Sequence, residues 1–153
     1  MLFRSDFSAT TTKSVTVDLS NAAAQVVTPS NLTLTLSAGN TIENVIGGSQ
    51  ADVLMGNALN NALTGGGGND TLTGGIGNDS LTGGTGNDAY LFDADLALGS
   101  DTINEAGGGT DTLDFSATTT KSVTVDLSNA AAQVVTPSNL TLTLSAEIGR
   151  AHV

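Results

Sequence analysis

The feature that most constrains this chain is a nine-residue period that begins at Gly47. Five consecutive blocks align and end at Leu91, namely GGSQADVLM, GNALNNALT, GGGGNDTLT, GGIGNDSLT and GGTGNDAYL. An apolar residue returns every nine positions, at Leu54, Leu63, Leu72, Leu81 and Tyr90. One face of an α-helix needs apolar residues every three or four positions, so this spacing disfavours a helix.

The nine-residue unit is typical of short strands joined by tight loops. Residues 71–73 and 80–82 are too short to form independent structure, and the glycines between them permit a positive φ and a tight reversal. Two blocks per circuit give a coil of 18 residues per turn, with parallel strands stacked about 4.8 Å apart. We therefore predict an all-β fold, a parallel β-roll (a β-solenoid) over residues 47–91 with strand-rich flanks.

This coil would stack acidic residues along its two edges. Asp52, Asp70 and Asp88 fall on one edge, and Asn61 and Asp79 fall on the other. Carboxylates roughly 5 Å apart repel by about 3 kcal/mol at an effective dielectric of about 20, so a cation would offset the repulsion. Calcium takes about six to eight oxygen ligands in flexible geometry, whereas zinc prefers His or Cys, and the chain has a single His and no Cys. The alternative is that these loops are only turns, which Asn and Asp favour for local reasons.

The last three blocks match Gly-Gly-x-Gly-x-Asp-x-apolar-x at every fixed position, which is the pattern of a known calcium-binding β-helix repeat. The chain therefore resembles the repeats-in-toxin (RTX), or haemolysin-type, calcium-binding family. The resemblance implies a module of a larger bacterial protein that is exported by type I secretion, with Ca²⁺ as its ligand. It also implies the extracellular space or the cell surface as the location.

The resemblance also implies a set of metal-binding residues. Asp70, Asp79 and Asp88 would be side-chain ligands, and Asp52 is a weaker candidate because its loop lacks the full pattern. The strongest site is expected between the loops of Asp70 and Asp88, and one that uses Asp79 with Asn61 carries less charge. The glycines that would shape the loops and expose carbonyl ligands are Gly65, Gly66, Gly68, Gly74, Gly75, Gly77, Gly83, Gly84 and Gly86.

The flanks contain a long repeat, because residues 6–38 recur unchanged as residues 114–146. An assembly artefact and a natural tandem array both remain open as explanations. Alternating apolar and polar residues predict strands at 14–19 and 32–36, with Pro29 in the turn between them. A further strand, at residues 42–46, is expected to lead into the first repeat.

The nine-residue phase fails after Leu91, although residues 107–115 look like another loop followed by a strand. The flank is therefore expected to continue the solenoid. Asp93, Asp95 and Asp101 could form a further cation site, but the favoured interpretation is solvated loop charge.

The two ends of the chain resemble translated sequencing-adapter DNA and differ in character from the rest. We therefore expect five parts. They are an adapter-derived segment at 1–5, an N-terminal flank at 6–46, the β-roll at 47–91, a C-terminal flank at 92–146 and a second adapter-derived segment at 147–153.

Composition excludes several classes of function. The 15 acidic and 4 basic residues give a net charge of −11, which argues against a nucleic-acid partner. Apolar runs are too short to span a membrane. Residues 6–146 lack His and Cys, so Ser-His-Asp and Cys-His catalysis is excluded and no enzymatic activity is expected.

The predicted function is a calcium-binding module that folds on binding calcium outside the cell, with neighbouring domains of a parent protein as partners. One alternative is a structural or adhesive repeat unit of a giant surface adhesin. Another is an ice- or surface-binding solenoid, for which Thr64, Thr73 and Thr82 would form an outward ladder.

Overall fold

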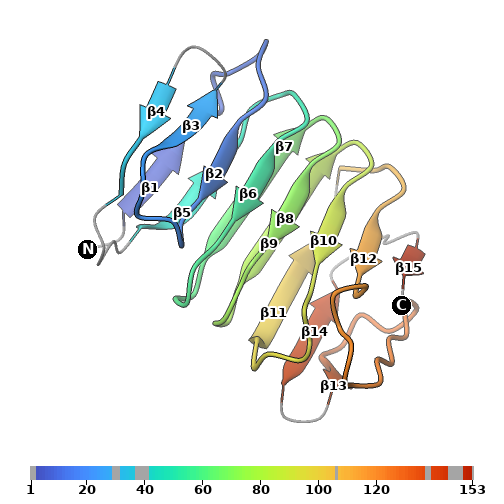
Figure 1. Ribbon diagram of the computed structural model, residues 1–153. Helices are drawn as coiled ribbons and strands as arrows, with labels where there is room; N and C mark the ends of the chain where they lie inside the picture. The colour runs from blue at the N-terminus through green and yellow to red at the C-terminus, as the bar shows by residue number, and fades with distance from the viewer. Residues whose placement is uncertain are drawn as a thin grey trace.

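The computed structural model describes residues 3–28, 32–36, 42–105, 107–136, 139–144 and 150–152. Within these ranges the chain forms β-strands and loops and no helix, so no helix of the length and apolar character of a membrane span is found there. Successive turns stack side by side as two facing sheets, which Figure 1 shows from the blue N-terminal end to the red C-terminal end. The all-β parallel roll predicted from the repeats is confirmed.

The roll is built from a seven-stranded and a six-stranded sheet. The first has, in spatial order, β1 (Phe3–Asp6), β5 (Ile42–Ile46), β7 (Ala62–Gly67), β9 (Ser80–Thr85), β11 (Gly99–Asn104), β14 (Leu140–Leu144) and β13 (Gln133–Thr136). The second has β15 (Arg150–His152), β12 (Thr112–Asp114), β10 (Ala89–Leu91), β8 (Thr71–Thr73), β6 (Val53–Met55) and β2 (Thr16–Asp18). A separate hairpin joins β3 (Gln25–Thr28) and β4 (Leu32–Leu34).

Strand pairing within the repeats follows the predicted 18-residue turn. Val53 pairs with Thr71, and Thr71 pairs with Ala89, in parallel register. The next turn is longer, because Ala89 pairs with Thr112 and Ser80 pairs with Thr102. The C-terminal flank therefore continues the solenoid, as expected, with extra residues in its loops.

This register separates the three threonines that were predicted to form one ladder. Thr64 pairs with Thr82 on the seven-stranded sheet, whereas Thr73 lies on the six-stranded sheet and pairs with Met55. Neighbouring blocks alternate between the two sheets, so residues nine positions apart face opposite sides of the roll. The predicted ladder is wrong, and the ice-binding interpretation loses the feature that supported it.

Two rows of apolar side chains fill the space between the sheets. The five predicted ladder residues have no exposed surface, and strand pairing extends their rows into the flanks. One row is Val17, Leu54, Leu72, Tyr90 and Leu113. The other is Val45, Leu63, Leu81, Ile103 and Leu144. The core thus continues through the flanks, which adds apolar burial that the five repeats alone lack.

The two identical flank segments adopt different structures. In the first copy β2 pairs with β6 and buries Val17, whereas the equivalent Val125 is only partly buried and its segment forms no strand. In the first copy β4 pairs with β3 alone, but the equivalent β14 pairs with both β13 and β11. Because the sequences are identical, the available sheet edge decides which residues form strands.

The predicted strands at 14–19 and 32–36 correspond to the shorter β2 and β4. The sequence interpretation missed β3, which is the antiparallel partner of β4. The turn expected at Pro29 lies outside the described residues.

The two copies allow a matched test of core packing. Val17→Ala is expected to lower the stability of the calcium-loaded protein by about 2 kcal/mol, because a side chain without exposed surface leaves a cavity. Val125→Ala removes the same atoms from a partly exposed position and should cost less than about 1 kcal/mol. Urea unfolding of both variants measures the difference, and equal losses would contradict the different environments of the two copies.

Candidate metal centre

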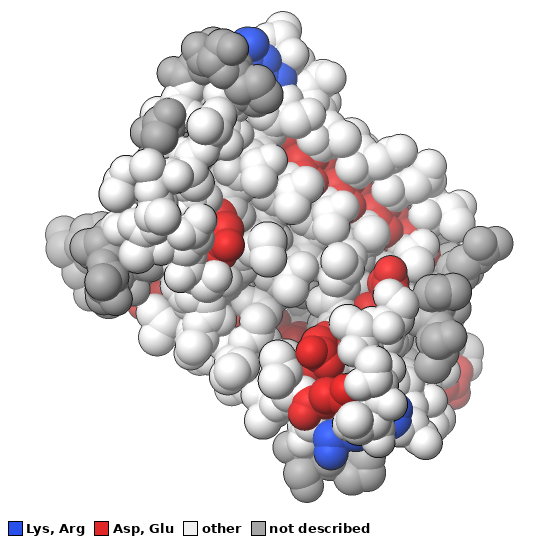
Figure 2. All heavy atoms as spheres, viewed as in Figure 1, with Lys and Arg blue, Asp and Glu red and all other residues white. Residues whose placement is uncertain are grey.

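One edge of the roll carries a ladder of four buried aspartates, Asp52, Asp70, Asp88 and Asp111. In the last three, the Oδ1 atom accepts a hydrogen bond from the backbone N–H of the aspartate one turn earlier. These bonds join the N–H of Asp52 to Asp70, that of Asp70 to Asp88 (both 2.8 Å) and that of Asp88 to Asp111 (2.9 Å). Figure 2 shows acidic side chains in a row across the stacked turns. The predicted stacking on one edge is confirmed, and Asp111 extends it by a turn.

The opposite edge carries a shorter ladder of Asn61, Asp79 and Asp101. The N–H of Asn61 donates to Asp79 Oδ1 at 2.8 Å, and the N–H of Asp79 donates to Asp101 Oδ1 at 2.9 Å. Asp101 is only 2% exposed, so the favoured interpretation of this residue as solvated loop charge is wrong. The inserted residues before β11 hid its place in the ladder.

The other two acids of that stretch do not join a ladder. Asp95 lies on a loop and accepts hydrogen bonds from the hydroxyls and N–H groups of Thr120 and Thr119. These bonds hold the pKa of Asp95 well below its ordinary value. Asp93 is half-buried and borders a groove on another face.

The remaining carboxylate oxygens of the ladders form the candidate donor set for a cation. The Oδ2 atoms of Asp70, Asp79, Asp88 and Asp111 are buried and have no hydrogen-bond partner. A buried charged oxygen without a partner costs more than about 1–3 kcal/mol. Hard cations such as calcium satisfy carboxylate and carbonyl oxygens of this kind, so the donor set fits Ca²⁺.

Asp52 and Asn61, at the first turn, differ from the other ladder members. Asp52 Oδ1 accepts from the N–H of Val15 at 2.7 Å, and its Oδ2 accepts from the N–H of Gly48 at 2.6 Å. Asn61 Oδ1 accepts from the N–H of Asn57 at 2.9 Å. Their side-chain oxygens are therefore already engaged by the backbone.

Glycines at the first two positions of the repeat blocks permit the close approach of loops and carboxylates. A methyl group added at Gly65 would overlap Asp70 Oδ2 and the carbonyl oxygen of Gly83. Gly66 has a φ of 111°, and a methyl group there would overlap the carbonyl oxygen of Gly48. Of the other predicted loop glycines, those with positive φ are Gly68, Gly75, Gly77, Gly84 and Gly86, and those that lie against a carboxylate are Gly74 and Gly83.

A ladder of asparagines beside the aspartates was missed in the sequence. Asn69 Oδ1 accepts from the N–H of Asn87 at 2.9 Å, and Asn87 Oδ1 accepts from the N–H of Thr110 at 2.7 Å. Asn60 and Asn78 form the equivalent bond on the other edge. The signal was present, since Asn occupies the fifth position of four consecutive blocks.

Burial makes the ladder carboxyls weaker acids in the metal-free protein. Desolvation raises the pKa of Asp70 to about 7, and the charges of Asp88 and Asp52 add to the rise. Desolvation also raises the pKa of Asp101 to about 7 and moves the pKa values of Asp79 and Asp88 in the same direction. Near neutral pH, calcium must therefore compete with protons for these oxygens.

Acidification from pH 8 to pH 6 is expected to raise the calcium concentration at half-saturation about tenfold for each competing carboxyl with a pKa near 7. The pKa of Asp70 is higher in the folded state than in the unfolded chain. The metal-free fold is therefore most stable in acid, and it loses that stability as the pH rises through 7. Calcium titrations followed by circular dichroism at both pH values measure the shift, and coincident curves would contradict it.

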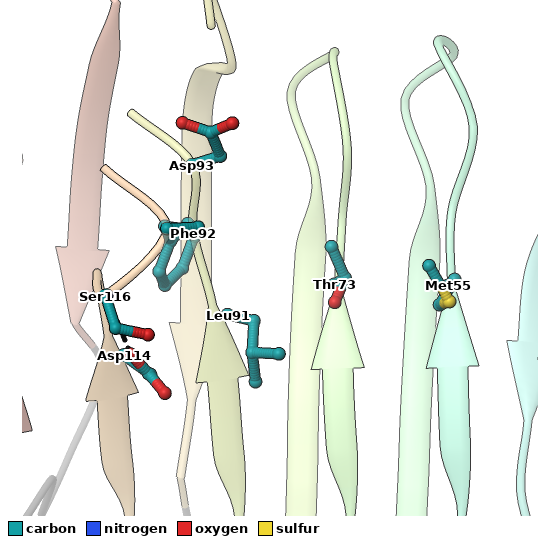
Figure 3. A pocket seen from close by; sticks show the side chains of 8 residues that line it. Met55, Thr73, Leu91, Phe92, Asp93, Asp114 and Ser116 are labelled. Atoms are coloured by element: carbon teal, nitrogen blue, oxygen red, sulfur yellow. Dashed lines mark hydrogen bonds between the residues drawn. The ribbon is translucent and has the colours of Figure 1, made fainter. Parts of the chain in front are cut away.

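A groove of about 260 Å³ lies on the outer face of the six-stranded sheet. Met55, Thr73 and Leu91 border it on successive strands, next to Phe92 (Figure 3). Its lining is mainly apolar and does not include the ladder carboxylates, so the candidate metal-binding oxygens lie at the edges of the roll rather than here.

Comparison with protein families finds four copies of the RTX calcium-binding nonapeptide repeat at residues 55–90. A search of curated proteins found no match to the chain. RTX nonapeptides bind Ca²⁺, form a structural, non-catalytic module and are typically found in secreted bacterial proteins. The predicted resemblance and the predicted cofactor are confirmed.

Proposed function

Because residues 55–90 are RTX calcium-binding nonapeptide repeats, we propose that this chain is a module of a larger secreted or surface-displayed bacterial protein that folds on binding calcium. Neighbouring domains of that protein would supply its specific activity.

The observation that carries the proposal is the set of buried, unpartnered Oδ2 atoms along both edges. In the metal-free fold these oxygens are either ionised and desolvated or protonated, and both states oppose compaction at neutral pH. A bound calcium ion would supply the missing partner for several oxygens at once. Its binding free energy would then contribute directly to folding.

The proposed ligands follow the geometry of the loops. Asp70, Asp79 and Asp88 offer side-chain oxygens, and the loop glycines offer carbonyls close to the neighbouring turn. The strongest site between repeat loops would use Asp70 and Asp88. Asp52 and Asn61 would contribute less, since their oxygens already accept backbone hydrogen bonds.

Dependence on calcium suits a protein that must leave the cell unfolded. Calcium is scarce in the cytoplasm and plentiful outside, so the chain would stay extended during export and fold after it. The typical occurrence of RTX repeats in secreted bacterial proteins supports this location.

Circular dichroism of the full chain in chelator and in millimolar calcium tests the proposal. We expect a coil spectrum without calcium, a β spectrum with it, and no such change when magnesium replaces calcium, since Mg²⁺ demands a stricter octahedral geometry. The same β spectrum in chelator and in calcium would contradict the proposal.

The recurrence of residues 6–38 at 114–146 favours a second candidate, a structural or adhesive array. The parent gene distinguishes the two. Many repeats of a 108-residue unit, the offset between the two copies, would indicate a stalk or adhesin. A single roll beside a catalytic domain would indicate an accessory module.

A further inference from the structure

Glu105 occupies the position that Gly47, Gly65 and Gly83 hold in the three preceding turns of its sheet. Asn104 pairs with Thr82, so Glu105 follows β11 where Gly83 follows the paired part of β9. At Gly83 a side chain would overlap Asp88 Oδ2. The segment from Glu105 to Asp111 is one residue longer than the repeat loop from Gly83 to Asp88. The extra residue gives room for a side chain.

The Glu105 side chain enters the interior of the edge rather than the solvent. It is only 2% exposed, and its Oε1 atom accepts from the N–H of Gly83 at 3.2 Å. The same N–H donates to the Tyr90 hydroxyl oxygen at 2.7 Å. Carboxylate oxygens of Asp88, Glu105 and Asp111, one from each, lie within 4.8 Å of one another.

Each of these three carboxylates has one engaged oxygen and one bare oxygen. The N–H groups of Asp70, Gly83 and Asp88 donate to Asp88, Glu105 and Asp111 respectively. The second oxygens, Asp88 Oδ2, Glu105 Oε2 and Asp111 Oδ2, are buried without a partner. Three buried acids with three unsatisfied oxygens require positive charge, and no repeat loop supplies it.

We propose that Asp88, Glu105 and Asp111 form an additional site for a hard divalent cation, which joins the last repeat loop to the C-terminal flank. The site lies beyond the four matched repeats and is built around a residue type absent from their consensus. It rests on the proposed calcium-dependent folding, since Asp88 is shared with the repeat ladder. With three carboxylates it should bind calcium more tightly than a site between two repeat loops, which has two carboxylates.

Glu105→Gln in the full chain tests the site, with Glu43→Gln as the matched control on β5. Isothermal titration of calcium into the chelator-treated proteins should show a loss of about one ion per chain for Glu105→Gln and no loss for Glu43→Gln. Glu105→Gly restores the residue of the earlier turns, so it should fold in calcium and show the same loss. Folded Glu105 variants with the wild-type ion count would overturn the site and leave the proposed function intact, whereas a wild-type chain that takes up no calcium would overturn both.

Terbium, which replaces calcium in oxygen sites, gives a second measurement. Tyr90 is the only tyrosine and the chain has no tryptophan, so sensitised emission reports on ions near its hydroxyl. The wild type and Glu43→Gln should give equally strong tyrosine-excited terbium emission, and Glu105→Gln should lose the part that comes from this site. A wild-type protein that binds calcium yet sensitises no terbium would count against the site without recourse to any variant.

Discussion

Asp70→Ala combined with Asp88→Ala is expected to abolish folding at calcium concentrations that saturate the wild type. The pair removes two bare Oδ2 atoms and both Oδ1 acceptors that hold the N–H groups of Asp52 and Asp70. Each lost hydrogen bond to a charged group costs about 1.5–3 kcal/mol, and the ions held by these oxygens are lost as well. The sum approaches the total stability of a small domain, about 5–15 kcal/mol. Calcium titration followed by circular dichroism should show a midpoint at least a hundredfold higher, or no transition.

The charge-matched control is Asp93→Ala combined with Asp126→Ala. Asp126 is exposed, and its carboxylate accepts from the N–H and the hydroxyl of Ser128 in its own turn. Asp93 is half-buried at the groove. This variant loses the same net charge but leaves both ladders complete, so its midpoint should stay within about twofold of the wild type. If both double variants lost folding equally, the effect would belong to net charge and not to the ladder.

The strictly periodic part of the chain could be predicted from its sequence. In residues 47–91 every loop has the same length, so counting residues places Asp70 above Asp88 without knowledge of the fold. The same counting should have separated Thr73 from Thr64, because an odd number of blocks places two residues on opposite sheets. That error came from reading a nine-residue period where the structural unit has eighteen residues.

The end of the ladders could not be predicted, because the loops there change length. Asp101 and Asp111 are displaced by 22 and 23 residues from Asp79 and Asp88, so no fixed period reaches them. Their places depend on the pairing of β11 and β12 with the last repeat strands. Glu105 was invisible for the same reason, since it takes the place of a glycine only in the paired structure.

The identical flanks mark a second limit of local sequence. Residues 16–18 form β2, whereas the equivalent 124–126 form no strand. At one end of the six-stranded sheet, β2 pairs with β6. At the other end, β15 pairs with β12, so that edge is already occupied. Strand propensity is therefore overridden by which sheet edge is open.

Gly66→Ala is expected to lower the stability of the roll strongly, although it leaves every carboxylate in place. Gly66 has a φ of 111°, a region that costs a residue with a Cβ atom about 1–2 kcal/mol. The new methyl group would also overlap the carbonyl oxygen of Gly48 in the preceding turn, and overpacking of this kind costs about 1–3 kcal/mol. The combined loss of about 3 kcal/mol lowers the folding equilibrium constant more than a hundredfold at fixed calcium. Urea unfolding in saturating calcium measures it.

Gly67→Ala, in the same loop, separates backbone geometry from glycine content. Gly67 lacks a positive φ, and its nearest neighbour to an added methyl group would be Thr85 Oγ1 at 3.3 Å. This variant should change stability by less than about 1 kcal/mol, because the native conformation accepts a side chain and the unfolded chain loses some freedom. A large difference between the adjacent variants would show that stacked carbonyls and positive φ hold the loops in register. Equal, small effects would mean that the turns do not approach one another closely enough to share a cation.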